Sequence, residues 1–200
     1  MIAVLDYGIG NLRSAEKALR RVGGDAHLIT DPADGIGAAG VVLPGVGAFG
    51  RCMEALRETG LDRVVMDVVA AGTPFLGICV GMQMLYDGSD EDPGVSGLGV
   101  LAGKIRLLPD GVKRPQMQWN RLDPLVPESP LLAGLAKDAW VYFVHSYAPE
   151  PSDDVVATCD YGGPVVAAAA HGRVWATQFH PEKSGPAGLR LLANFVAACR

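Results

Sequence analysis

Long basic runs and long apolar segments are both missing from this chain of 200 residues. The formal net charge is −5, so the surface offers no positive patch for nucleic acid or for an anionic membrane. No apolar stretch approaches the roughly 18 to 20 residues that a membrane-crossing helix needs, and the first apolar segment lacks the charged start of a signal peptide. We therefore expect a cytoplasmic protein whose partner is a small molecule or another protein, with no nucleic acid and no membrane.

Cysteines at zinc-binding or redox spacing are lacking as well. The four cysteines are scattered without a CxxC pair, so neither a zinc site nor a disulfide framework is predicted. The histidines and carboxylates show no ligand spacing, and we expect no metal and no cofactor. Three cysteines are expected to pack as small buried hydrophobic residues, namely Cys52, Cys159 and Cys199.

The remaining composition is that of a folded chain. Hydrophobic residues make up 49% and charged residues 20%, which is ordinary for a compact domain. The length favours one domain over residues 1–200. Apolar strand patterns and helical segments alternate in the first half. Residues 2–8 are expected to form a buried strand followed by a turn, and further strands are expected at residues 25–29, 40–45 and 74–78.

Alternating strands and helices are typical of a parallel sheet covered on both faces. From residue 98 the pattern changes to consecutive strands joined by turns, which predicts partly antiparallel pairing, and a helix is expected near residues 187–199. The predicted fold is therefore α/β, with a mixed, mostly parallel central sheet flanked by helices. Residues 87–97 (DGSDEDPGVSG) are acidic and rich in Gly, Pro and Ser, so we expect an exposed loop there.

Cys79 lies where an apolar strand is expected to run into a helix. The segment PFLGICVGMQ places it between Gly77 and Gly81, which provide the small volume and the backbone freedom of a sharp turn. Such a turn projects a nucleophile above the sheet, the N-terminus of the next helix favours the thiolate, and the N–H of Val80 is directed at the same point. A buried cysteine at the end of a core strand is the alternative, so the hypothesis requires a base.

A base is available in the segment WATQFHPEKS, where a strand is expected to end at His180. Residues i and i+2 of an extended segment face the same side, so Glu182 can orient the His180 imidazole. His180 would take the Cys79 proton and return it to a leaving amine. A hydrogen-bonded surface histidine is the alternative, and His145 and His171 stay open as competing bases.

A glycine-rich turn, PGVGAFG at residues 44–50, directly follows another expected strand. Turns of this kind expose backbone N–H groups that can form an oxyanion hole or an anion nest. A plain tight turn is the alternative. No Gly-Lys-Ser/Thr follows, so the turn is not a phosphate loop.

Together these motifs resemble the class I glutamine amidotransferases, through GICVGMQ around Cys79 and HPE at residues 180–182. PGVGAFG, the pair Trp119-Asn120, YFVHSY and FHPEKS narrow the resemblance to the glutaminase subunits of imidazole glycerol phosphate synthases. It extends from LDYGIGNL near the start to the final helix. The resemblance implies the glutamine amidotransferase fold for the whole chain and the hydrolysis of glutamine to glutamate and ammonia.

The resemblance also implies a role for each matching residue. Cys79, His180 and Glu182 would form the catalytic triad. The N–H groups of Val46 and Val80 would form the oxyanion hole, and in this family the Val46 peptide flips on activation. The implied substrate contacts are Gly47, Gln83, His145, Ser146 and Tyr147.

A partner is implied in the same way. Similar proteins dock on a (β/α)₈-barrel cyclase subunit as a heterodimer, and the cyclase uses the ammonia to make imidazole glycerol phosphate and an aminoimidazole carboxamide ribonucleotide in histidine biosynthesis. Trp119, Tyr142 and Lys183 match positions near that interface. One departure is PQMQWN in place of PHMGWN, so that Gln116 and Gln118 replace a histidine and a glycine. We expect this departure to affect the local loop and the docking geometry and to leave the triad untouched.

Four other readings compete with this one. The glutaminases that serve pyridoxal phosphate, anthranilate or GMP synthesis are disfavoured for two reasons. The glycine-rich turn of this chain is PGVG, and Lys183-Ser184 directly follows the HPE motif. A catalytically silent binding subunit has no need of a Cys-His-Glu set. A cysteine hydrolase of peptides or γ-glutamyl compounds is disfavoured by Gln83 and by the lack of a long peptide-binding insertion. A metal enzyme fits least, because a thiol nucleophile needs no metal.

Overall fold

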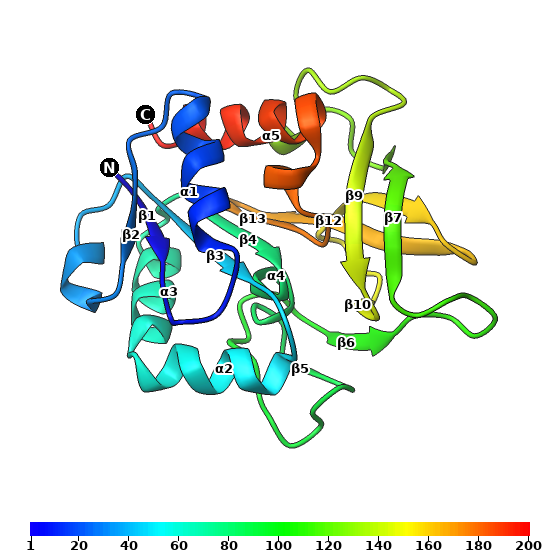
Figure 1. Ribbon diagram of the computed structural model, residues 1–200, viewed down its shortest axis with the longest axis horizontal. Coiled ribbons are helices and arrows are strands. Elements are labelled where there is room, and N and C mark those ends of the chain that lie inside the picture. Colours follow the sequence, from blue (N-terminus) through cyan, green and yellow to red (C-terminus); the bar gives the residue numbers. More distant parts are fainter.

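A mixed sheet of eight strands forms the centre of the computed structural model, which describes residues 1–200 (Figure 1). Five neighbouring strands run parallel, and the remaining three continue the sheet in antiparallel pairs. This arrangement confirms the predicted mixed, mostly parallel sheet. In spatial order the strands are β2 (Ala26–Ile29), β1 (Ile2–Leu5), β3 (Gly40–Gly45), β4 (Phe75–Cys79), β13 (Val174–Thr177), β12 (Pro164–His171), β11 (Val155–Asp160) and β8 (Asp123–Pro124).

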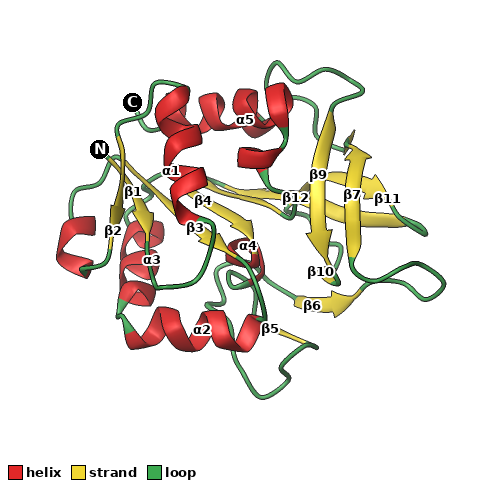
Figure 2. Cartoon of the chain, in the orientation of Figure 1, coloured by secondary structure: helices red, strands yellow, loops and turns green.

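Helices cover both faces of the parallel part of the sheet (Figures 1 and 2). On one face α1 (Leu12–Arg21) packs against α5 (Gly185–Ala198), and on the other α2 (Phe49–Glu58) packs against α3 (Leu61–Ala70). Gly60, between α2 and α3, has a φ of 72°, a left-handed conformation that glycine adopts without steric cost. The chain therefore turns at Gly60 between two separate helices.

Two smaller sheets lie beside the antiparallel part of the main sheet. One contains β10 (Tyr147–Pro149), β6 (Lys104–Leu107) and β5 (Gly88–Ser89), and the other pairs β7 (Gln116–Arg121) with β9 (Trp140–His145). Short helices complete the chain: η1 (Pro32–Gly35), α4 (Val80–Gln83), η2 (Pro130–Leu132) and η3 (Pro181–Lys183). None of the helices combines the length and the apolar character that crossing a membrane requires.

The strands of the parallel part read as continuous apolar runs because both of their faces are buried. Val4, Val42 and Leu76 in β1, β3 and β4 have no exposed surface. Gly45 at the end of β3 pairs with Cys79 at the end of β4, and β13 ends alongside them. The carboxyl ends of parallel strands are the usual place for ligand sites in α/β folds, and the sequence motifs converge there.

Residues 87–97 are an exposed loop only in part. Gly88 and Ser89 are buried in β5, and the chain then folds back over the start of α2. Glu91 Oε2 accepts a hydrogen bond from the backbone N–H of Phe49 at 2.9 Å, and Asp92 Oδ2 accepts one from Gly50 at 2.8 Å. Ala48, at the N-cap position of α2, has no side chain that can accept these hydrogen bonds. Glu91 and Asp92 therefore cap the helix in its place.

Candidate active site

Cys79 occupies a strained turn between β4 and α4. Its φ of 55° and ψ of −112° make it the one non-glycine residue with a positive φ. The turn brings α4 close against β3, because a Cβ atom on Gly81 would lie 1.8 Å from the carbonyl oxygen of Leu43. Strained backbone of this kind is concentrated at functional sites, and a strand-to-helix turn of this form presents a nucleophile.

The helix that follows Cys79 is shorter than the sequence pattern suggested. α4 contains only four residues, Val80–Gln83. A single turn aligns few peptide dipoles, so its N-terminus favours a negative sulfur less than a full helix would. Stabilisation of a thiolate at Cys79 therefore depends more on the surrounding side chains.

His180 and Glu182 form a buried pair. Nδ1 of His180 lies 2.8 Å from Oε1 of Glu182, and the two side chains are 2% and 3% exposed. The predicted proximity of the two side chains is confirmed. The backbone between them forms the helical turn η3, however, and not the extended segment that was expected. Burial alone would lower the pKa of His180, but the neighbouring Cys79 thiol and the Glu182 carboxylate outweigh it and raise the pKa to about 9.

The free nitrogen of His180 is placed for proton transfer. Nε2 is buried and completes no hydrogen bond of good geometry, although the Cys79 thiol is close enough to raise the pKa of the ring. Catalytic hydrogen bonds are often long before substrate binds. The arrangement leaves Nε2 available to a proton from the thiol or from a bound molecule.

The two competing histidines are engaged elsewhere. His171 Nδ1 contacts Asp154 at 2.9 Å at the surface, with the His171 side chain 67% exposed. His145 is buried, and burial lowers its pKa to about 4, so the ring is neutral near pH 7. Its Nδ1 donates the one N–H of the neutral ring to the carbonyl oxygen of Tyr147 at 2.8 Å, and its Nε2 accepts from the side-chain amide of Gln116 at 2.9 Å. Both nitrogens of His145 are thus occupied.

Buried side chains hold the glycine-rich turn that follows β3. The Tyr7 hydroxyl donates to the carbonyl oxygen of Pro44 at 2.7 Å, and the Cys52 thiol donates to that of Val46 at 3.3 Å. Burial raises the pKa of Tyr7 and raises that of Cys52 to about 11, so both groups keep the protons that they donate. These bonds set the path of the backbone beside Cys79.

A cavity of about 240 Å³ opens over the Cys79 sulfur. It lies below the roughly 300–1,000 Å³ of drug-sized ligand sites, which suits a small substrate. His180 also lines it. The residues predicted as oxyanion hole and substrate contacts all lie in its wall: Val46, Gly47, Val80, Gln83, His145, Ser146 and Tyr147.

Two further residues of this region were missed by the sequence analysis. Glu91 lines the cavity, although its segment looked like a solvated loop. Gln178 has no exposed surface, and its Nε2 lies 3.7 Å from the Cys79 sulfur. Its position two residues before His180 was the one available signal.

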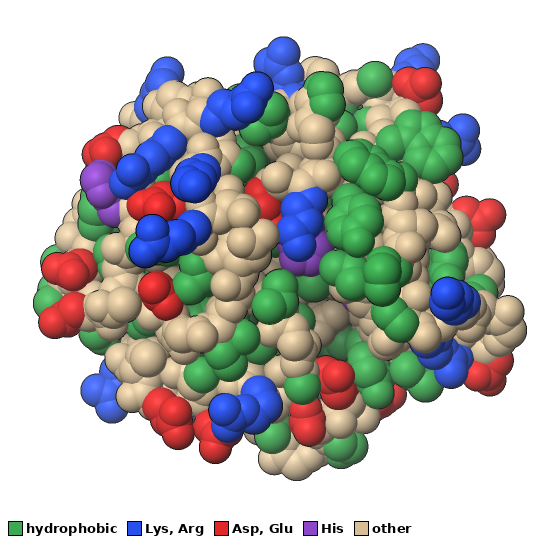
Figure 3. All heavy atoms as spheres, viewed as in Figure 1, with side chains coloured by type: hydrophobic (Ala, Val, Ile, Leu, Met, Phe, Trp, Pro, Cys, Tyr) green, Lys and Arg blue, Asp and Glu red, His purple; other side chains and the backbone are tan.

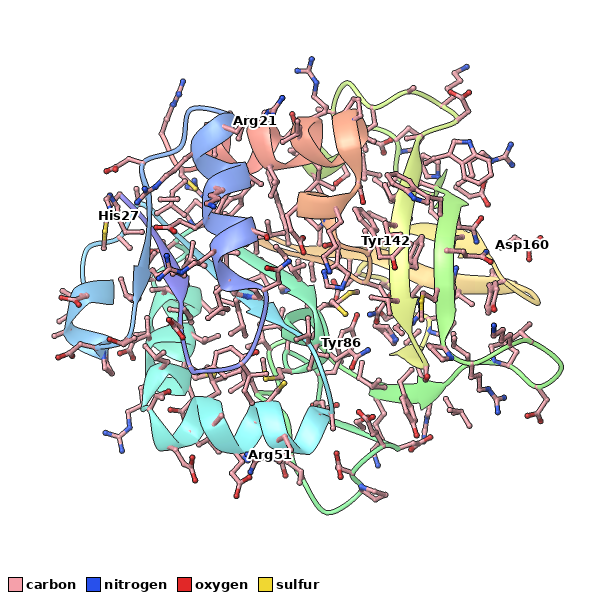
Figure 4. The ribbon with its side chains drawn as sticks, viewed as in Figure 1. Arg21, His27, Arg51, Tyr86, Tyr142 and Asp160 are labelled. Carbon is pink, nitrogen blue, oxygen red and sulfur yellow. The ribbon has the colours of Figure 1, made fainter.

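Aromatic side chains lie on the face beside the cavity. Trp119 is 47% exposed, and its ring centroid lies 6.0 Å from that of the half-buried Tyr142 on β9. Figure 3 shows hydrophobic side chains gathered over β7 and β9, and Figure 4 labels Tyr142 among them. Lys183 is exposed next to Glu182.

Gln116 does not lie where its sequence neighbours suggested. It has no exposed surface, whereas Gln118 is exposed on the outer part of β7. Pairing of β7 with β9 places Gln116 opposite His145, to which its amide is hydrogen-bonded. The departure at Gln116 is therefore buried behind His145, which lines the cavity.

Comparison with known proteins identifies relatives over nearly the whole chain. The glutamine amidotransferase class-I family matches residues 3–199. A Methanothermobacter thermautotrophicus protein named imidazole glycerol phosphate synthase subunit HisH is 52% identical over 204 residues, with 100% of both chains covered. A Deinococcus radiodurans protein of the same name is 49% identical, with 97% of this chain and 92% of the relative covered.

Solved structures agree with this relationship at the level of the fold. A structure described as a glutamine amidotransferase superposes with a TM-score of 0.77 at 22% identity, over 98% of both chains. A Thermotoga maritima structure described as PurLQS gives a TM-score of 0.78 at 20% identity, over 100% of this chain and 98% of the other. The chain therefore belongs to the class-I glutamine amidotransferase family.

Proposed function

We propose that this chain is the glutaminase subunit of an imidazole glycerol phosphate synthase and that Cys79, His180 and Glu182 are its catalytic triad. The observation that carries the proposal is the convergence of these three side chains beside one small cavity, with Cys79 on a strained turn and the His180–Glu182 contact buried at 2.8 Å. Relatives about half identical over the full length are named as subunits of this synthase.

The reaction follows from the positions of these groups. His180 Nε2 takes the thiol proton, and the Cys79 sulfur attacks the side-chain carbonyl carbon of glutamine. The N–H groups of Val46 and Val80 stabilise the oxyanion. His180 then protonates the departing nitrogen as the C–N bond breaks, which releases ammonia and leaves a thioester. Attack by water on the thioester, with His180 as base, yields glutamate and free Cys79.

Glu182 acts through His180. Its carboxylate accepts a hydrogen bond from Nδ1–H, which leaves Nε2 directed at the sulfur and stabilises the imidazolium formed during the reaction. Gly47, Gln83, His145, Ser146 and Tyr147 are proposed to hold the substrate, because all of them line the same cavity.

Glu91 is proposed to bind the α-ammonium group of glutamine, because it is the acidic side chain in the cavity wall apart from the triad. Glu91→Gln keeps an acceptor for the N–H of Phe49 but removes the charge, so we expect the KM for glutamine to rise about tenfold or more. Asp92→Asn is the matched control, since Asp92 caps the same helix without lining this cavity. Steady-state glutamate production measures both, and an equal KM for the two variants would refute the assignment.

The partner is proposed to be a (β/α)₈-barrel cyclase subunit, joined to this chain as a heterodimer. It would use the ammonia to make imidazole glycerol phosphate and aminoimidazole carboxamide ribonucleotide in histidine biosynthesis. Trp119, Tyr142 and Lys183 are proposed to contact it, supported by the half-exposed Trp119 ring and its neighbour Tyr142 beside the cavity.

The function is tested by glutamate production from glutamine, by the isolated chain and by the chain mixed with the cyclase and its ribonucleotide substrate. We expect strong activation in the mixture and no activity with Cys79→Ala. High activity of the isolated chain would support the proposed catalytic mechanism. It would refute activation by the partner, including activation through a flip of the Val46 peptide. If no glutamate is produced under any of these conditions, the result would favour a silent binding subunit.

A further inference from the structure

We propose that Gln178 positions the nucleophile, because its side-chain amide donates a hydrogen bond to the Cys79 sulfur and joins that sulfur to Gln83 in the substrate cavity. The inference rests on the proposed function in one respect, which is that Cys79 is taken as the nucleophile. It adds a residue outside the triad that acts on the reacting atom.

Gln178 is held rigidly in the core. It directly follows β13, has no exposed surface, and its backbone N–H donates to the carbonyl oxygen of Ala167 at 2.8 Å. Its side chain makes two contacts: Nε2 lies 3.7 Å from the Cys79 sulfur, and Oε1 lies 3.1 Å from Nε2 of Gln83. A buried amide usually has its polar atoms paired, and both ends of this one are.

The direction of these hydrogen bonds is set by a backbone carbonyl. Gln83 Nε2 also lies 3.0 Å from the carbonyl oxygen of Tyr147, which can only accept. Gln83 must therefore present its NH₂ group, and Gln178 must present its carbonyl oxygen to that group. The NH₂ group of Gln178 is then left to face the sulfur. Reversal of either amide would bring two donors or two acceptors together.

A donor fixed in this direction favours the charged form of the sulfur. The thiolate accepts a hydrogen bond from an amide N–H, whereas the thiol gains less from it, and bonds to charged groups are the stronger ones. This contribution matters here because α4 is only one turn long. The carbonyl of Val144, 4.0 Å from the sulfur, is an acceptor for the thiol form.

Gln178 also connects the nucleophile to the substrate contacts. The chain of amides runs from the Tyr147 carbonyl through Gln83 and Gln178 to Cys79. Gln83 and Tyr147 line the cavity, whereas Gln178 is buried behind it. Because Gln178 contacts the sulfur but does not line the cavity, we expect it to affect the reactivity of the sulfur more than the binding of glutamine.

The experiment is the rate of alkylation of Cys79 by iodoacetamide as a function of pH, in the full chain without glutamine, with the labelled cysteine identified by mass spectrometry. Gln178→Met keeps the length of the side chain and removes the donor. We expect the midpoint of the pH profile to move up by about one pH unit, the rate at pH values well below the midpoint to fall about tenfold, kcat to fall, and the KM for glutamine to change by less than about threefold.

A matched control is available at another buried glutamine. The amide of Gln116 also has no exposed surface and contacts a sulfur, that of Cys159, at 3.8 Å. Gln116→Met is expected to leave the alkylation profile of Cys79 unchanged. The titratable groups coupled to Cys79 are His180, Cys52 and Tyr7, and Glu91, His145 and Tyr147 line the same cavity; neither substitution replaces any of them.

An unchanged midpoint in Gln178→Met with a cooperative unfolding transition would overturn the inference. If Gln178→Met does not fold, Gln178→Glu carries the test, because a carboxylate can accept from Gln83 but repels the thiolate, and its midpoint is expected to rise further. Failure of the proposed function looks different. A wild-type chain that never hydrolyses glutamine, but whose profile shifts in Gln178→Met, would refute the function and keep the role of Gln178.

Discussion

Replacing His180 by Asn is expected to lower kcat for glutamine hydrolysis at least about 10³-fold, whereas His171→Asn leaves it unchanged. His180 is the histidine whose ring reaches both Cys79 and Glu182, and those neighbours raise its pKa to about 9. At pH 7 its charged form therefore stabilises the thiolate and supplies a proton to the leaving ammonia. His171 is tied to Asp154 at the surface. Single-turnover and steady-state glutamate assays measure both effects.

The same substitutions separate the competing bases. Circular dichroism and urea unfolding should show both variants folded, since neither change leaves a large cavity. His145 is neutral near pH 7 and bonded at both nitrogens, so it cannot replace the lost base. Activity of His180→Asn within about tenfold of the wild type would refute the triad, since general acid–base catalysis usually supplies more than that.

Replacing Gly81 by Ala is expected to destabilise the fold by about 3 kcal/mol or more, with a fall in Tm of about 10 °C. The new Cβ would lie 1.8 Å from the Leu43 carbonyl oxygen, which is backbone and moves only if β3 moves. Because β3 leads into the glycine-rich turn beside Cys79, we also expect glutaminase activity to fall. Urea unfolding followed by circular dichroism measures the change in free energy of unfolding.

Gly94→Ala is the control for the Gly81 substitution. A Cβ atom on Gly94 would have no heavy atom within 4 Å, so this substitution is expected to change the free energy of unfolding by less than about 0.5 kcal/mol. Equal stabilities of the two variants would show that α4 does not pack as closely on β3 as the structure has it.

Sequence patterns alone predicted the elements and the chemistry that depend on neighbours in the chain. Apolar strands alternate with helical segments, which predicted a mostly parallel sheet and placed Cys79 and the PGVG turn each at the end of a strand. His180 and Glu182 are two residues apart, and their proximity was therefore predictable although the backbone path was not. The glycines around Cys79 signalled a sharp turn for a steric reason that the structure confirms.

Only the tertiary structure decided the contacts of Glu91, Gln116 and Gln178. Glu91 meets Phe49, which is 42 residues away in sequence, and Gln178 meets Cys79, which is 99 residues away. Gln116 reaches His145 through the register of β7 with β9. An acidic loop looks solvated, and a glutamine carries no pattern of its own, until distant segments contact Glu91 and bury Gln116 and Gln178. Burial is what obliges a polar group to find a partner, and burial is a property of the packed chain and not of its local sequence.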